Sequence, residues 1–189
     1  MTHPAVQIPS DWKEVLQQIQ VMFPSAIIAG GALRDLWHNK PIKDVDIFIP
    51  VIDCDDDLFS AHIKSIDPQA IVIAASIYGQ TATGDPTGLR YIHAVWQMLI
   101  KGTIYEVIFI QDRNSDILED FDISICQIGY DGNSLKTTAA FNRSIFDKVL
   151  RVCNINRGDR QINRITRIHS KYTEYTIDPE LASFEIPFL

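Results

Sequence analysis

The chain has 189 residues, 46% of them hydrophobic, which is enough to bury one sizeable core as a single domain. Its three cysteines are odd in number and lack the spacing of a zinc site or a disulfide framework, which favours buried or incidental thiols in a reducing, cytoplasmic compartment. The sequence does not open like a signal peptide, and no apolar run reaches membrane-spanning length, so we expect no membrane partner.

Charge is unevenly distributed along the chain. The net charge of −7 argues against a uniformly basic, nucleic-acid-binding surface. Residues 136–171, however, contain nine Lys or Arg and only two acidic residues. This basic stretch predicts contacts with nucleotide phosphates, an RNA end, or both; alternatively, its cations only balance the acidic remainder of the chain.

The first predicted element is an amphipathic helix capped by Ser10 or Asp11 and ending near Met22. After it, an apolar strand over 26–29 meets the pair Gly30-Gly31, where backbone can approach an anion closely. A short helix over 32–37 follows. We expect it to end at Asn39, which tolerates a left-handed conformation.

The next predicted strand carries two carboxylates. Alternation over 43–49 places Asp44, Asp46 and Phe48 on one face of the strand. Two carboxylates side by side repel each other, and one of them should have a raised pKa. The arrangement therefore favours a divalent cation between them.

The remaining elements indicate an α/β or α+β chain with a mixed sheet of about five strands. We expect a helix over 58–66, a strand over 71–76, a loop over 78–89, a hairpin of strands over 90–100 and 103–110 around Lys101-Gly102, mainly strands up to 131, and helices after Thr138. The acidic run over 53–57 is read as a solvated loop or helix start.

The pattern Gly-Gly-x-Leu-Arg-Asp, a helix, then Lys-Asp-x-Asp resembles the signature of the class II tRNA nucleotidyltransferase and bacterial poly(A) polymerase family, within the polymerase-β-like nucleotidyltransferase superfamily. The residues in register are Gly30, Gly31, Arg34, Asp35, Lys43, Asp44 and Asp46. The resemblance implies a catalytic head over residues 1–135 and a basic helical extension over 136–189 that packs on it as one compact unit.

Two later segments extend the resemblance. Asp120 and Phe121 match a family segment whose aspartate is associated with the ribose of the incoming nucleotide, although Leu118 and Glu119 replace its two arginines. The stretch from 164 to 172 resembles a basic family helix and supplies Arg164, Arg167 and Lys171 as nucleotide-binding candidates. Taken alone, this stretch could be an ordinary basic amphipathic helix.

A two-metal site needs a third acid. Glu106, in the middle of an apolar strand, is the first candidate, and Asp122 is the second. Alternatively, Glu106 faces solvent and pairs with a cation across the strand. Asp35 is expected to pair internally with a basic side chain.

The resemblance implies transfer of NMP from an NTP, ATP or CTP, to an acceptor hydroxyl such as a tRNA 3′ end. Asp44, Asp46 and Glu106 would hold two Mg²⁺ or Mn²⁺ ions, while Gly30, Gly31 and Arg34 would hold phosphates.

The family's Glu-Asp-x-x-Arg segment has no counterpart, so a short catalytic head of phage type is expected instead of a complete CCA-adding enzyme. A toxin-like enzyme modifying tRNA or a protein hydroxyl, and a non-catalytic nucleotide sensor, are the alternatives. The acceptor and the oligomeric state stay open.

Overall fold

The computed structural model describes residues 6–51, 56–75, 92–111, 116–153 and 158–179. The helices in these ranges are α1 (Ser10–Gln20), α2 (Gly31–Trp37), α3 (Asp56–Ile66), α4 (Ile117–Asp120), the 3-10 helix η2 (Ser124–Cys126), α5 (Ala139–Asp147) and α6 (Gly158–Lys171). The strands are β1 (Ile27–Ala29), β2 (Val45–Val51), β3 (Ile71–Ala75), β4 (Ile92–Ile100), β5 (Thr103–Gln111), β6 (Ile128–Tyr130), β7 (Leu135–Thr137), β8 (Val149–Leu150) and β9 (Thr176–Ile177).

A mixed sheet of seven strands, in the order β3-β4-β5-β2-β1-β6-β7, forms the centre of the described structure. β2 and β5 pair in parallel, whereas the other neighbours are antiparallel. The expected α/β fold with a mixed sheet is confirmed. The sheet is wider than the expected five strands because β6 and β7 join its far edge. β6 lies in the stretch up to 131 where strands were expected, whereas β7 was not expected, since three residues are too few to produce a visible alternation.

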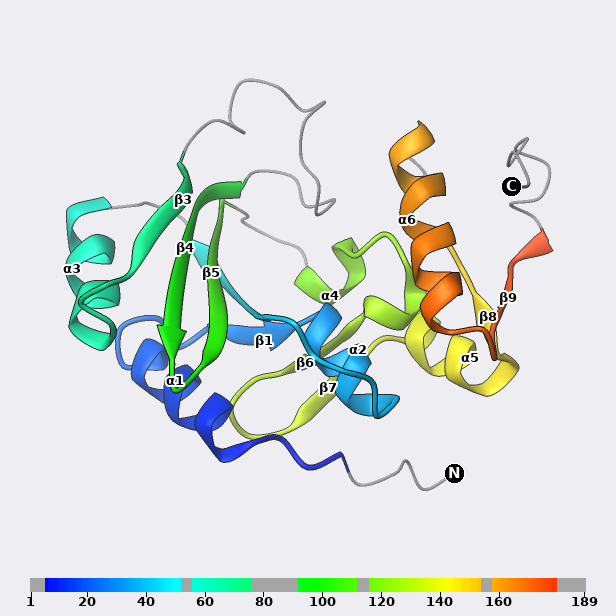
Figure 1. The fold of residues 1–189 in the computed structure, drawn as a ribbon, viewed down its shortest axis with the longest axis horizontal. Helices are drawn as coiled ribbons and strands as arrows, with labels where there is room; N and C mark the ends of the chain where they lie inside the picture. The colour runs from blue at the N-terminus through cyan, green and yellow to red at the C-terminus, as the bar shows by residue number, and fades with distance from the viewer. Residues whose placement is uncertain (1–5, 52–55, 76–91, 112–115, 154–157, 180–189) are drawn as a thin grey trace.

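The two faces of the sheet bury separate cores. α1 and α3 cover one face, where Trp12 and Phe59 pack with Ile47 of β2. On the other face, Phe48 packs with residues from α4, η2 and α6. α3 and β3 lie at one end of the molecule, and α6 with β8 and β9 lies at the other (Figure 1). The acidic and basic candidates are therefore brought together from distant parts of the chain.

The N-terminal helix begins one residue earlier than expected. Pro9 occupies the capping position, and no side chain caps the first turn, so neither Ser10 nor Asp11 acts as the cap. The expected buried face is confirmed, since the described side chains that pack inward are Trp12, Val15, Leu16, Ile19 and Phe23. α2 ends as expected, with Asn39 in the left-handed conformation at φ 53°.

The hairpin of β4 and β5 is confirmed, with Lys101 and Gly102 at φ 51° and 83°. The segment after β5 differs from the expected strand, because residues 117–120 form α4 and residues 124–126 form η2. Asp116 accepts a hydrogen bond from the backbone N–H of Leu118, and this local cap favours a helical turn over a strand. The loop expected over 78–89 and most of the acidic run at 53–57 lie outside the described residues, but α3 starts at Asp56.

Residues 138–153 and 158–179 form a smaller layer beside the sheet. Thr138 caps α5 by accepting from the N–H of Phe141 at 3.1 Å. β8 precedes α6 in the sequence and β9 follows it, and the two strands pair in parallel. β7 crosses the boundary proposed at 135/136, and the division itself stays a prediction. Within the described ranges, no helix is both long and apolar enough to cross a bilayer.

Candidate active site

One cavity of about 580 Å³ contains most of the residues singled out in the sequence. Its walls come from α2, the approach to β2, β2, β5, the residue after α4, and α6. The described lining residues are Gly31, Ala32, Arg34, Asp35, Lys43, Asp44, Asp46, Phe48, Glu106, Ile108, Phe121, Arg164, Arg167, Ile168, Ser170 and Lys171.

The acidic wall lies on the two central strands of the sheet. Asp46 on β2 is directly opposite Glu106 on β5, so their side chains share one face. Asp44 immediately precedes β2, and it lines the same cavity together with Phe48. This agrees with the alternation expected for the strand. The neighbour of Glu106 on β4 is Gln97, whose side-chain nitrogen lies 3.5 Å from the Glu106 carboxylate.

Electrostatics at this wall disfavour three ionised carboxylates. Burial, followed by the nearby charges of Asp44 and Glu106, raises the pKa of Asp46 to about 7. The positive charges of Arg164 and Arg34 act in the opposite direction, but they do not compensate. A cation between the carboxylates would therefore be stabilised by the site.

The turn between β1 and α2 places backbone against the acids. Gly30 has φ +80°, and a β-carbon there would lie 3.2 Å from the ring of Phe121. At Gly31, a β-carbon would lie 3.9 Å from a carboxylate oxygen of Asp46. The turn thus needs a glycine at position 30, whereas a β-carbon at Gly31 would make only ordinary van der Waals contacts.

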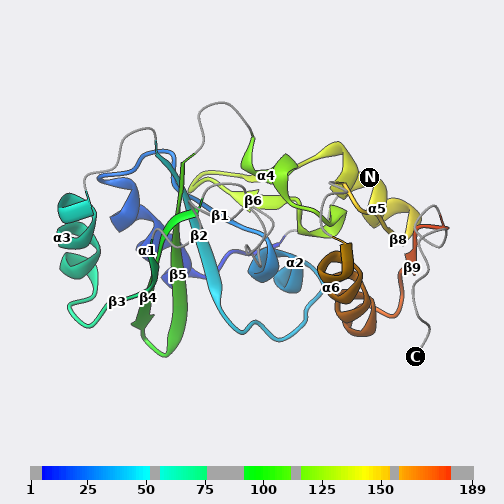
Figure 2. The ribbon, with the colours of Figure 1, turned by 90° about the horizontal axis from the view of Figure 1, so that it is seen from above.

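The basic wall is α6, which lies beside α2 (Figure 2). Arg164, Arg167 and Lys171 follow one another at helical spacing and line the cavity. Arg164 forms an ion pair with the buried Asp122, at 3.5 Å from its Nε. Ile165 and Ile168 are buried in the second core, and Ile168 also borders the cavity beside the basic residues.

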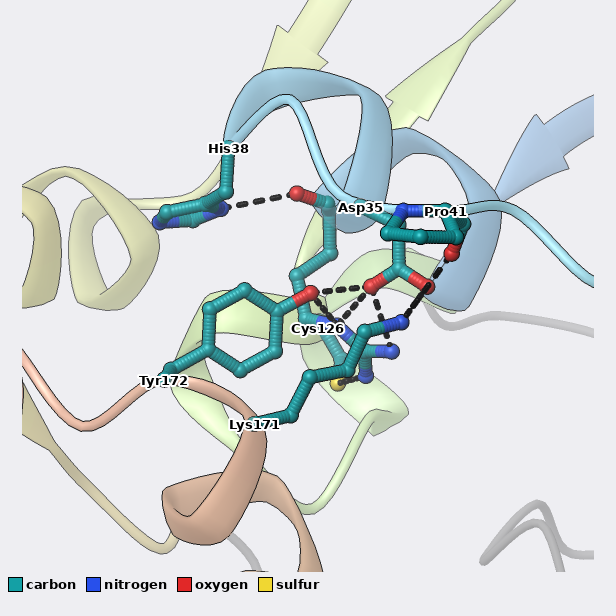
Figure 3. A network of polar contacts seen from close by, with 7 residues as sticks. Asp35, His38, Pro41, Cys126, Lys171 and Tyr172 are labelled. Atoms are coloured by element: carbon teal, nitrogen blue, oxygen red, sulfur yellow. Dashed lines mark hydrogen bonds and ion pairs between the residues drawn. The ribbon is translucent and has the colours of Figure 1, made fainter.

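A polar network joins α2 to the end of α6 around Asp35 (Figure 3). This buried carboxylate accepts from Arg34 Nε at 2.9 Å, from Lys171 Nζ and from the hydroxyl of Tyr172. Arg34 also donates to the Tyr172 oxygen at 2.9 Å and to Cys126 Sγ at 3.2 Å. Burial alone would raise the pKa of Asp35, but Arg34 and the hydrogen bonds from Lys171 and Tyr172 lower it. The internal partner expected for Asp35 is therefore present.

His38 forms a second link between α2 and the chain after α6. Its ring nitrogens lie 2.7 Å from the backbone oxygen of Arg34 and 2.7 Å from the Tyr175 hydroxyl. Its ring also packs edge-on against Tyr172. Burial is the main cause that lowers the pKa of His38. This favours a neutral imidazole that donates at one nitrogen and accepts at the other.

The structure separates the candidates into two groups. Those in the cavity lining are Gly31, Arg34, Lys43, Asp44, Asp46, Glu106, Arg164, Arg167 and Lys171. Gly30, Asp120 and Asp122 do not belong to the described lining: Gly30 is at the turn, Asp120 ends α4, and Asp122 pairs with Arg164. The sequence reasoning missed Tyr172 and Cys126, both of which contact Arg34. Only the position of Tyr172 directly after the basic helix hinted at a role.

The donor set suits a divalent metal, although its side chains do not form a finished site. Within the described ranges, no group of three or more His, Cys, Asp or Glu side chains is arranged so that it could hold a metal ion. Asp44, Asp46 and Glu106 nevertheless supply carboxylate oxygens to one cavity, the ligand type that Mg²⁺ and Mn²⁺ prefer. The pKa of Asp46 is raised, and a cation bound between the carboxylates would lower it again.

The fold is shared with solved tRNA-processing enzymes. A structure titled "tRNA-processing enzyme (apo form I)" is 17% identical, with a TM-score of 0.65 over 92% of this chain and 45% of that one. A Thermotoga maritima CCA-adding enzyme complexed with tRNA is 16% identical, with a TM-score of 0.64 over 92% of this chain and 40% of that one.

A tRNA nucleotidyltransferase bound to a primer tRNA and an ATP analogue is 17% identical, with a TM-score of 0.60 over 86% of this chain and 46% of that one. The chain therefore spans less than half the length of these structures. At such identities the likeness establishes the fold, which is that of a nucleotidyltransferase head.

Sequence comparison gives a more specific relationship. No curated protein matches the chain. Residues 10–148 match the family model described as "Gad2: Gabija anti-defense 2 family protein", and this range includes the glycine turn and all three carboxylates of the acidic wall. Because the match covers well over half of the sequence, the chain belongs to the Gad2, or Gabija anti-defense 2, protein family.

Proposed function

We propose that this protein is a metal-dependent nucleotidyltransferase that transfers NMP from an NTP to an acceptor hydroxyl and releases pyrophosphate. The observation that carries the proposal is the division of one cavity into an acidic wall, with Asp44, Asp46 and Glu106, and a basic wall on α6. A nucleoside triphosphate with its divalent cation has the complementary charges. The nucleotidyltransferase fold supports the proposal independently.

Each wall would have a distinct task. Asp44, Asp46 and Glu106 would hold Mg²⁺ or Mn²⁺, which when bound supplies Lewis-acid activation of the acceptor hydroxyl and neutralises the phosphates. Asp122, the alternative third ligand, is less suitable because it already pairs with Arg164. The acceptor oxygen would form a bond to the α-phosphorus while the bond to pyrophosphate breaks, with the acceptor's proton leaving to solvent.

The basic side chains would hold the triphosphate against the turn at Gly30 and Gly31. Those in the lining are Arg34, Lys43, Arg164, Arg167 and Lys171. The proposed head, residues 1–135, would thus supply the carboxylates that hold the metal. The proposed extension, residues 136–189, would supply most of the cations that face the phosphates. Phe48 and Phe121 provide an apolar surface within the same cavity for the sugar or base.

The acceptor is proposed to be an RNA 3′ end. The solved relatives include complexes with tRNA, and CTP and ATP complexes of CCA-adding enzymes, which supports an RNA acceptor and either nucleotide as donor. The family description, "Gabija anti-defense 2", supports the further proposal that this transfer counters a defence system named Gabija. A non-catalytic sensor is disfavoured because all three carboxylates line the cavity.

An incorporation assay tests this function. Purified protein is incubated with Mg²⁺ or Mn²⁺, each labelled NTP separately, and cellular RNA that includes tRNA trimmed at its 3′ end. Asp44→Asn should abolish labelling, whereas Glu14→Gln, which alters an exposed acid paired with Lys101, should not. Label in one RNA class would support the proposal, label in protein would identify the toxin-like alternative, and NTP binding without label would refute catalysis.

A further inference from the structure

The five cations that line the cavity are not equivalent. Arg34 and Lys171 both pair with Asp35, Lys43 pairs with Asp44 at 2.9 Å, and Arg164 pairs with Asp122. Within the described part of the chain, Arg167 is the cavity-lining cation whose side chain has no carboxylate partner. Four positive charges are thus already compensated by the protein.

The pairing pattern also fixes the position of Arg167. Arg164, one turn before it, is held by the buried Asp122, and Lys171, one turn after it, is held by Asp35. Between these points Ile165 and Ile168 are 2% and 5% exposed. The backbone of α6 is therefore anchored on both sides of Arg167, while the guanidinium itself stays exposed to the cavity.

We infer that Arg167 binds the triphosphate tail of the nucleotide and makes the protein select triphosphates over monophosphates; this rests on the function proposed above. A guanidinium has a planar set of donors that matches two phosphate oxygens at once. The acidic wall on β2 and β5 faces the same cavity. The acids would hold the divalent cation, whereas Arg167 would contact the phosphate oxygens directly. An uncommitted cation gains most from a phosphate because no protein ion pair has to break first.

Affinities measured by titration calorimetry for Mg-ATP, Mg-AMP and Mg-tripolyphosphate test the inference. Arg167→Gln should weaken ATP and tripolyphosphate binding about tenfold or more and leave AMP binding within about twofold. Arg167→Lys should recover part of the loss, because it restores the charge without the planar donors. Arg143→Gln, which changes an exposed arginine on α5, is the matched control.

Arg164→Gln separates a direct contact from a general disturbance of α6. Because Arg164 is paired with Asp122, its loss should lower the ratio of ATP to AMP affinity less than the loss of Arg167 does. An unchanged ratio of ATP to AMP affinity in Arg167→Gln would overturn the inference while leaving the proposed transferase intact. If the native protein binds none of the three ligands, both the inference and the proposed transferase are overturned. If tripolyphosphate binding depends on Arg167 but no nucleotide is transferred, the anion site at Arg167 stands and the proposed transferase falls.

Discussion

Replacing Asp46 by asparagine should stabilise the metal-free protein while removing its activity. Burial, followed by the charges of Asp44 and Glu106, raises the pKa of Asp46 to about 7 from an ordinary value of 3.8. Each pKa unit corresponds to about 1.4 kcal/mol, so ionising Asp46 costs the folded state about 4 kcal/mol at most. Asparagine keeps the shape and removes this charge.

The sign of the pH dependence follows from the raised pKa. Below about pH 3, Asp46 is mostly protonated in both folded and unfolded chains and contributes almost no difference. As the pH rises from about 4 to 7, the unfolded chain ionises first, and the folded state progressively loses stability; above about 7 the loss is complete. The native protein should therefore lose stability relative to the asparagine variant across this window.

Urea unfolding in EDTA between pH 4 and 8.5 measures the effect. At pH 8 we expect Asp46→Asn to raise the free energy of unfolding by about 2 to 4 kcal/mol and Tm by roughly 5 to 15 °C. Added Mg²⁺ should stabilise the native protein and narrow the difference. Equal stabilities at pH 8, or a difference that does not change with pH, would refute the argument that burial and the neighbouring carboxylates disfavour the ionised form of Asp46.

Three further changes test other parts of the site. Glu106→Gln should reduce nucleotide incorporation to a few per cent or less and raise the Mg²⁺ concentration needed, as a metal titration of the residual rate would show. Asp35→Asn should lower the free energy of unfolding by about 2 to 4 kcal/mol at pH 7, because it leaves buried cations without their anion. Since the pKa of Asp35 is lowered, this contribution should disappear as the pH falls below about 4, and a urea series that shows no such loss contradicts it. Gly30→Ala should cost about 1 to 3 kcal/mol more than Gly102→Ala by thermal unfolding, because both have positive φ but only Gly30 faces a ring at 3.2 Å; equal costs would disprove the steric part.

The sequence was informative where local chemistry decides the structure. The alternation around Asp44 and Asp46 depends only on the two-residue period of a strand, and the structure confirms that both line the cavity with Phe48. Asn39 adopts the expected left-handed conformation, and Lys101-Gly102 forms the expected turn. Each of these features is determined by a few residues that are adjacent in the sequence.

Features that depend on distant partners could not be predicted in the same way. The pairing of Arg164 with Asp122 joins residues whose neighbourhood is set by the docking of α6, and no sequence period encodes it. Tyr172 connects Arg34 with Asp35 for the same reason. β7 is recognisable only from its pairing with β6 in the sheet. The nucleotide-binding roles of these residues stay predictions.

The parallel pairing of β2 with β5 has a consequence for how the protein is made. Val45 finds its partner in Tyr105, about sixty residues further along the chain, which at the usual rate of synthesis leaves the ribosome about 3 to 12 s later. α6 follows later still, after another fifty or so residues. For seconds, therefore, β2 of the nascent chain has only β1 as a possible partner, so cotranslational folding would complete the acidic wall first and add the basic wall last.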